Sequence, residues 1–220
     1  MKPRKVLIVM DTLYFKRTFG VMVFRDWLNR ENLLWHYVPY ETIALYQQGI
    51  NELKAKGFEI LGIVVDGRKG LMKLFKEPVQ MCQFHQLQIV RRYITNNPNL
   101  EAGIELKALC EKLIKTDRLS FEGWLNKWFL KWRDFLGEKT TDPKTGSKHF
   151  THSRLRSAYR SLKTNIPYLF VYQEHLDINM PNTTNTLEGS FAHVKDKVRL
   201  HRGLKIERKK KLIDELLKKK

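Results

Sequence analysis

The first third of the chain consists of short apolar runs separated by polar turns, a pattern that predicts β-strands. An amphipathic helix is predicted over residues 40–56, where apolar side chains recur at helical spacing before Gly57. The predicted strands occupy residues 6–10, 19–24, 34–38, 59–65 and 79–84. The first and fourth runs, VLIVM and EILGIVV, are rich in β-branched residues, as central strands are. This order of elements predicts a mixed α/β fold.

Beyond residue 85 the apolar spacing becomes that of helices. Helices are predicted at residues 87–95, 102–114, 121–136, 153–162 and 186–200. Polar stretches containing proline predict loops at residues 138–150 and 180–185. We expect a discontinuous α/β core that is interrupted by a helical insertion. A basic tail follows the core, and we expect it to form a helix with frayed ends. The expected boundaries are 1–85 and 179–205 for the core, 86–178 for the insertion and 206–220 for the tail.

The charge of the chain narrows the choice of partner. Lysine and arginine together number 41 against 23 acidic residues, which gives a net charge of +18 and a pI near 9.9. A protein this basic is typically a ligand of a polyanion, most often nucleic acid. Two cysteines give no disulfide framework, the apolar run at residues 6–10 is too short for a signal peptide, and no run is long enough to span a membrane. These features favour a cytoplasmic protein with no membrane partner.

Three acidic residues are candidate metal ligands. Asp11 and Asp66 each follow a buried apolar run directly, where a carboxylate is costly unless it is paired, hydrogen-bonded or metal-bound. The alternative is that both are ordinary turn residues. Glu188 lies near the start of the last predicted helix, where Asn185 is the predicted N-cap and Glu188 its capping-box partner. This structural role is compatible with metal binding, because a helix N-terminus favours an ionised carboxylate.

The helix that carries Glu188 also carries cations on the same face. Ala192, Lys195 and Arg199 follow Glu188 at helical spacing. A carboxylate followed by two cations on one face suits a site where a metal ion and DNA phosphates meet.

Four segments together resemble the Mutator-like and related bacterial insertion-sequence transposases. They are VLIVMDTLYF, GIVVDGRKGL, VQMCQFHQLQIVRRYI and NTTNTLEGSFAHVKDKVRLHRGL, in this order. The resemblance implies a DDE enzyme with an RNase H-like core and a helical insertion between the second Asp and the Glu. It implies that Asp11, Asp66 and Glu188 bind two Mg²⁺ or Mn²⁺ ions, and it makes Cys82 and His85 the Cys-x-x-His mark of the family.

The implied activity is metal-dependent DNA cleavage and strand transfer that moves an insertion sequence. The implied partners are double-stranded DNA, both transposon ends and target, and further copies of the chain in a homo-oligomer on DNA. Because the first predicted strand begins near the first residue, we expect recognition of the ends to need a separate DNA-binding domain or chain. Two alternatives remain: a non-catalytic DNA-binding remnant of a transposase, or an RNase H-like nuclease that does not join strands.

Histidine and cysteine spacing raises the question of zinc. Cys82 and His85 would need two further ligands, and His149 and His152 have a suitable spacing, but nothing in the sequence brings the two pairs together. We favour instead a Cys82 buried on its strand and a catalytic His85 at a helix start near the active site, where it would contact the scissile phosphate or orient a ligand.

Basic and aromatic positions complete the set of candidates. Along one predicted helix, Arg156, Arg160 and Lys163 form a basic stripe, which is either a solvated face or a phosphate contact. The densest basic segment, residues 195–211, is interpreted as a DNA-backbone track, with Lys195, Arg199 and Arg202 as its main contacts. Three tryptophans at helical spacing predict core packing of the insertion, with stacking on an unpaired base as the alternative: Trp124, Trp128 and Trp132.

Overall fold

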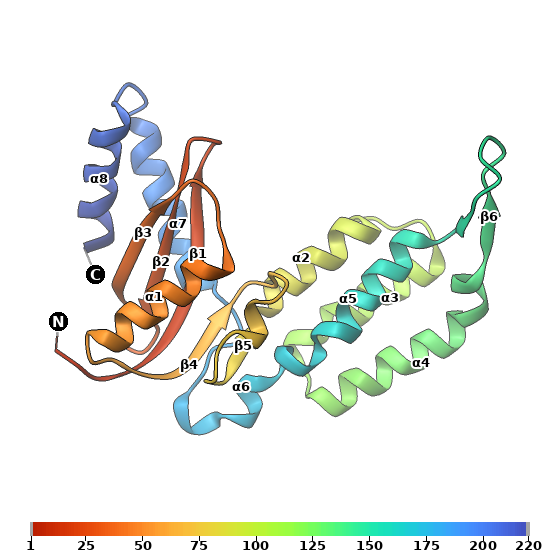
Figure 1. Ribbon diagram of the computed structural model, residues 1–220. Helices are drawn as coiled ribbons and strands as arrows, with labels where there is room; N and C mark the ends of the chain where they lie inside the picture. Colours follow the sequence, from red (N-terminus) through yellow and green to blue (C-terminus); the bar gives the residue numbers. More distant parts are fainter. Residues whose placement is uncertain (1, 219–220) are drawn as a thin grey trace. The chain divides into compact units, whose positions relative to one another are not determined.

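The computed structural model describes residues 2–218 and divides the chain into two compact units. The first unit contains the residues up to Cys82 and those from His175 onward, and the second spans Gln83–Glu174 (Figure 1). The bounds of the second unit lie a few residues before those predicted for the insertion, 86–178, and its role as an insertion stays a prediction. No helix in the described part of the chain is both long and apolar enough to cross a membrane.

A five-stranded mixed sheet forms the centre of the first unit. Its strand order is β3-β2-β1-β4-β5. The strands are β1 (Lys5–Phe15), β2 (Phe19–Asp26), β3 (Glu31–Val38), β4 (Glu59–Val65) and β5 (Val79–Met81). The first three strands pair antiparallel, whereas β4 pairs parallel with β1, and β5 pairs parallel with β4. The predicted mixed α/β fold is confirmed.

Three predicted strands have the wrong C-terminal ends. The smallest difference is in β2, which was expected to stop at residue 24 and continues to Asp26. The first was expected to stop at residue 10, but β1 continues through Asp11 because its pairing with β2 extends from Ile8 to Phe15. Asp11 is therefore a residue within β1 and not the residue that ends it. The strand predicted at residues 79–84 stops at Met81, because β4 ends at Val65 and offers no further partner.

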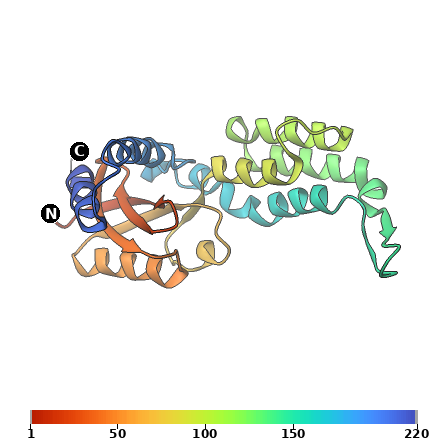
Figure 2. The same cartoon turned by 90° about the horizontal axis from the view of Figure 1, so that it is seen from above.

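Helices cover both faces of this sheet (Figure 2). One face carries α1 (Ile43–Ala55), and the other carries α7 (Asn185–Leu200) and α8 (Ile206–Lys218). The helix α1 packs so closely that a Cβ atom at Gly49 would overlap the ring of Phe24.

The predicted basic tail is in fact part of the core. The helix α8 buries Ile213 and Leu217 and presents its many lysines to solvent. Its Asp214 carboxylate accepts hydrogen bonds from the Trp35 indole nitrogen and the Tyr37 hydroxyl, both at 2.8 Å. An amphipathic helix on a sheet face is stabilised by this burial, so its ends do not fray as an isolated basic helix would. Residues 219–220 of the predicted tail lie outside the described residues.

Replacement of Asp214 by alanine tests the role of α8 in the core. The change leaves the Trp35 indole N–H without its hydrogen-bond acceptor, and we expect a loss of about 2 kcal/mol in the free energy of unfolding. Chemical denaturation measures this loss. Glu215→Ala is the matched control, because the Glu215 side chain is exposed and pairs with the exposed Lys218. An equal loss in both variants would contradict the assignment.

The second unit is helical apart from one short hairpin. Its helices are α2 (Gln83–Ile94), α3 (Glu101–Glu111), α4 (Arg118–Gly137), α5 (Ser153–Leu169) and α6 (Val171–Glu174). The loop predicted at residues 138–150 contains the strands β6 (Lys139–Thr141) and β7 (Lys148–Phe150). The helix α5 runs past the predicted end at residue 162, because Ile166 and Leu169 are buried and extend its apolar face beyond that point.

The tryptophans of α4 serve mainly to pack this unit. Trp128 is buried, and its indole nitrogen donates to the carbonyl of Ala102 in α3. The Trp132 indole nitrogen donates to the carboxylate of Glu105, which also belongs to α3. Only Trp124 is substantially exposed, which supports the predicted packing role for the other two.

Candidate functional site

Asp11 and Asp66 lie at neighbouring positions on adjacent strands. The parallel pairing of β1 with β4 aligns Val9 with Val64, and the same register continued by two residues aligns Asp11 with Asp66. Asp66 directly follows β4. Adjacent strands are roughly 4.8 Å apart, so the two backbones present their carboxylates side by side.

Both carboxylates leave the sheet on the face that carries α7. The Thr12 hydroxyl contacts the Tyr46 hydroxyl of α1 at 3.3 Å, so Thr12 faces α1. Successive side chains of a strand point to opposite faces, and Asp11 therefore faces α7, which packs on β1. Aligned residues of parallel strands share a face, which places Asp66 on that side as well.

The surroundings of Tyr46 support the proximity of the two acids. Burial raises the pKa of the Tyr46 phenol, and the negative charges of Glu41, Asp66 and Asp11 raise it further. The Arg68 backbone N–H donates to the Asp66 carboxylate at 3.1 Å, and the Arg68 guanidinium pairs with Glu41 at 2.8 Å. This ion pair holds the loop that follows Asp66.

Glu188 lies in the first turn of α7, but its predicted N-cap is wrong. The N-cap is Thr184, and Asn185 is the first helical residue. The backbone N–H of Glu188 donates to the Thr184 carbonyl at 3.1 Å, and the Thr184 hydroxyl contacts the Glu188 carboxylate at 3.1 Å. Two adjacent threonines and an asparagine precede the helix, and all three are good N-caps, so the sequence does not distinguish between them.

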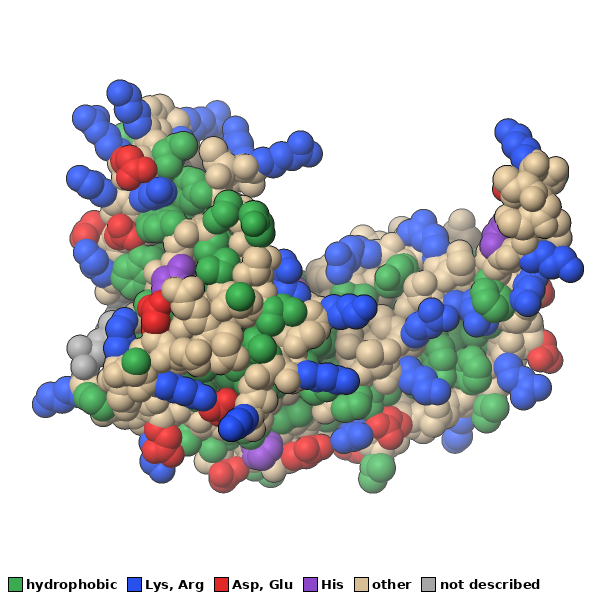
Figure 3. Space-filling view, in the orientation of Figure 1, with side chains coloured by type: hydrophobic (Ala, Val, Ile, Leu, Met, Phe, Trp, Pro, Cys, Tyr) green, Lys and Arg blue, Asp and Glu red, His purple; other side chains and the backbone are tan. Residues whose placement is uncertain are grey.

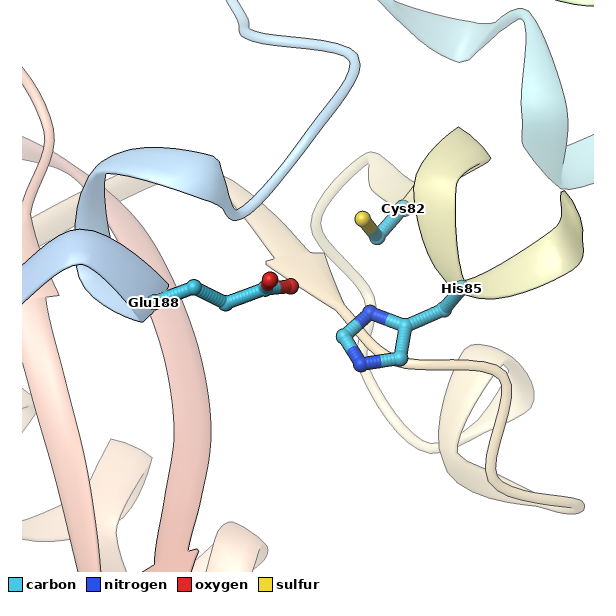
Figure 4. Close-up of side chains that lie close together, drawn as sticks. All are labelled: Cys82, His85 and Glu188. Carbon is cyan, nitrogen blue, oxygen red and sulfur yellow. The ribbon is translucent and has the colours of Figure 1, made fainter. Parts of the chain in front are cut away.

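Thr184 also joins Glu188 to Cys82, which follows β5 directly. The Thr184 backbone N–H and hydroxyl each lie 3.3 Å from the Cys82 sulfur. Because a hydroxyl has one proton, it donates to the sulfur or to the carboxylate at any moment, and the carboxylate is the stronger acceptor. Figure 4 shows the Glu188 side chain extending from α7 toward the side on which the Cys82 thiol lies. Cys82 is fully buried, as predicted.

Cys82 lies next to Asp66, just as Asp66 lies next to Asp11, so the three residues form a row across β1, β4 and β5. Val65 aligns with Met81, so Asp66 aligns with Cys82 in the continued register, and the Cys82 N–H donates to the Val65 carbonyl at 2.8 Å. Through Thr184, this row is connected to the start of α7. We interpret Cys82 as a positioning residue, because a thiol is a poor ligand for Mg²⁺.

His85 belongs to the first turn of α2, as expected for a helix start, and is also drawn in Figure 4. Two residues separate it from Cys82 along the chain. An imidazole is a ligand that zinc accepts, but a structural zinc site requires four protein ligands. Whether His85 acts in catalysis stays a prediction.

The three carboxylates suit a hard divalent cation, because Mg²⁺ and Mn²⁺ prefer oxygen ligands. Asp11, Asp66 and Glu188 all belong to the first unit and share one face of its sheet. Among the described residues, their oxygens do not all lie within 4.8 Å of one another. Binding of one ion by all three would therefore require at least one of these side chains to move.

The predicted DNA contacts of α7 lie together. Lys195, Arg199 and Arg202 line one cavity of the first unit, and Lys16 and Lys209, which sequence analysis did not select, join them there. The lysine of a hairpin turn and one lysine of a basic helix have no distinctive sequence signal.

The basic stripe of α5 has a partly structural role. Arg156, Arg160 and Lys163 line a smaller cavity of about 260 Å³. The Arg156 guanidinium donates to the Leu136 carbonyl at 2.8 Å and lies 3.6 Å above the ring of Phe150. Arg156 therefore fastens the hairpin to its helices, and Arg160 and Lys163 are the better candidates for phosphate contact.

Comparison of the chain with models of known protein families and with curated proteins found no match in either case.

Proposed function

We propose that the chain is the catalytic part of a DDE-type DNA transposase with an RNase H-like core. The alignment of Asp11 with Asp66 on one face of the sheet, with Glu188 in the first turn of a helix on that face, carries the proposal. Two-metal phosphoryl transfer needs carboxylates that converge from rigid elements, and the first strand, the end of its neighbour β4 and a helix start supply them. The net charge of +18 favours a polyanionic substrate.

The position of each acid agrees with the family that the sequence resembles. Asp11 belongs to the first strand, Asp66 follows the fourth, and Glu188 opens a late helix. The helical unit between Asp66 and Glu188 corresponds to the insertion of that family. Three antiparallel strands followed by two parallel ones fit the RNase H-like core expected from the resemblance.

Each group has a defined task in the proposed reaction. Asp11, Asp66 and Glu188 would hold two Mg²⁺ or Mn²⁺ ions, which when bound activate the attacking oxygen and stabilise the leaving oxygen. Water attacks the phosphodiester at a transposon end, the bond from phosphorus to the 3′ oxygen breaks, and a 3′-OH is released. That hydroxyl then attacks a phosphodiester of the target DNA, forms a new bond to phosphorus and displaces the 3′ oxygen of the target strand as a free 3′-OH. Thr184 and Cys82 hold the first turn of α7 in position.

A strand-transfer assay tests the proposal. A pre-cut, labelled duplex with the sequence of a transposon end, taken from the DNA that flanks the coding region, is incubated with a plasmid in Mg²⁺ or Mn²⁺, and its joining to the plasmid is measured. Metal-dependent joining supports the transposase. Metal-dependent cleavage without joining would favour an RNase H-like nuclease, and salt-sensitive DNA binding without cleavage would favour a non-catalytic remnant. A catalytically inactive Asp66→Asn variant separates the activity of the chain from that of a contaminating nuclease.

Replacement of Gly189 by alanine should separate stability from activity. Gly189 is exposed in the first turn of α7 beside Glu188, and a Cβ atom there would meet nothing within 4 Å. Alanine should therefore stabilise the helix by about 0.5–1 kcal/mol. We expect the rate of DNA cleavage to fall about tenfold, because the added methyl group occupies space that a DNA backbone needs to approach Glu188. A tenfold lower rate corresponds to about 1.4 kcal/mol of lost transition-state binding. Thermal unfolding and plasmid cleavage measure the two effects, and unchanged cleavage in a more stable variant would show that DNA does not approach there.

A further inference from the structure

The cavity of the first unit that Lys195, Arg199 and Arg202 line has a volume of about 500 Å³, and none of the three acids lines it. It lies among the turn between β1 and β2, the C-terminal half of α7 and the start of α8. Its volume is in the range of sites that bind small molecules, roughly 300–1,000 Å³. Figure 3 shows Lys and Arg side chains gathered around α8 and the turn that precedes it.

The wall of this cavity is apolar and partly aromatic. The rings of Phe15 and Phe19 stack with their centroids 5.2 Å apart. Val198 of α7 continues this surface, and the side chains of Tyr14 and Ile206 contribute to it while remaining 37% and 45% exposed. Phe19 is buried and Phe15 is half-buried, so it is mainly the Phe15 ring, backed by Phe19, that offers a surface on which a planar ring can stack.

Cations surround the same surface. They are Lys16, Lys195, Arg199, Arg202 and Lys209, and no acidic side chain lines the cavity. Among the described residues, only Arg199 of these five has a carboxylate partner, the exposed Asp196 at 3.4 Å. Like charges gathered without counter-charges repel one another, and a bound anion relieves that repulsion.

We propose that this cavity binds a single unpaired nucleotide, with its base against Phe15 and Phe19 and its phosphate among the surrounding cations. In a duplex the faces of the bases are stacked on one another and cannot contact the protein. A site for the duplex backbone therefore needs cations but no aromatic surface. A cavity with both features matches the way single-stranded nucleic acid is held, by stacked bases and a cationic groove.

The nucleotide has two sources: a free mononucleotide, or an unpaired position in a DNA strand such as a frayed or cleaved end. The proposal relies on the proposed function only for the expectation that DNA is the source. Binding can be measured in EDTA without any cleavage, so failure of the nucleotide site and failure of the metal site are distinguishable.

Fluorescence anisotropy with labelled 12-residue probes tests the proposal in the full chain. The probes are single-stranded DNA, a strand of the same length in which every position is abasic, and a blunt duplex. We expect the single strand to bind at least fivefold more tightly than the abasic strand and more tightly than the duplex. Competition by a deoxynucleoside monophosphate identifies a free nucleotide as the ligand, and its failure to compete with an intact strand identifies DNA.

Two pairs of variants assign the binding to the cavity. Lys195→Gln and Lys197→Gln each remove one exposed charge from α7, but only Lys195 lines the cavity. We expect Lys195→Gln to weaken single-strand binding about fivefold and Lys197→Gln less than twofold. Phe15→Ala should weaken binding of the single strand but not of the abasic strand, and Phe15→Tyr should restore it.

Two results would overturn the proposal. Equal affinity for the normal and abasic strands would show that only phosphate is recognised. Equal losses in the two lysine variants would show that binding depends on overall charge and not on the cavity. Circular dichroism of Phe15→Ala confirms that a loss of binding does not come from unfolding.

Discussion

Glu188→Gln is expected to abolish metal-dependent DNA cleavage and joining, with a loss of at least about 1,000-fold, because a two-metal site loses one anionic ligand. The amide oxygen of glutamine still accepts the hydrogen bond that the Thr184 hydroxyl offers at 3.1 Å. The start of α7 should therefore keep its structure, and DNA binding should change little. Single-turnover cleavage of a labelled duplex in Mn²⁺, alongside binding in EDTA, measures the two effects separately.

Glu207→Gln is the matched control for this experiment. It removes the same charge from the first turn of a neighbouring helix, α8, where the side chain is exposed and pairs only with Lys210. Full activity in Glu207→Gln and none in Glu188→Gln would place Glu188 in the catalytic site. Residual activity of Glu188→Gln near that of the unaltered chain would remove Glu188 from the proposed triad and leave α7 as a DNA-binding helix.

Gly49→Val is expected to cost the first unit about 3 kcal/mol or more in its free energy of unfolding. A Cβ atom at this position would overlap the ring of Phe24, which is fully buried in β2 and cannot move into solvent. Overpacking of a filled core typically costs 1–3 kcal/mol, and a β-branched residue adds volume beyond the Cβ atom. Urea denaturation, monitored by circular dichroism, measures the loss.

A second change in the same place tests the cause. Phe24→Leu shortens the ring that the new side chain would meet, so Gly49→Val should be less harmful in that background than alone. If the two losses simply add, the cost of Gly49→Val arises from the helix and not from contact with Phe24. Gly189→Ala, where the added atom meets open space, shows that a glycine in a helix of this unit is not in itself essential.

The sequence was most informative where local pattern and tertiary structure agree. The run at residues 59–65 predicted the bounds of β4 correctly, because a buried parallel strand is apolar throughout. The extension of β1 through Asp11 was missed, because it depends on antiparallel pairing with β2 and not on local hydrophobicity. Likewise, α8 was taken for a basic tail, since only two of its side chains, Ile213 and Leu217, are buried in the core.

The candidate site also combines residues that the sequence predicted with contacts that only the tertiary structure reveals. Asp11, Asp66 and Glu188 were selected by their places beside apolar runs and a helix start, and the strand register accounts for why two of them lie together. The link from Cys82 through Thr184 to Glu188 joins residues far apart in the chain, so no local pattern predicts it. Lys16 joins the basic cavity only because the β1–β2 turn approaches α7.

The first unit is assembled from two segments of chain that are separated by the whole of Gln83–Glu174. During synthesis the five strands therefore leave the ribosome well before α7 and α8, and the sheet face that those helices cover has no partner in the meantime. The helical unit, whose contacts are within one continuous segment, can fold during that delay. In the proposed enzyme, the metal site would be complete only after α7 is synthesised, when Glu188 reaches a sheet that already carries Asp11 and Asp66. A chain terminated before α7 would lack that site.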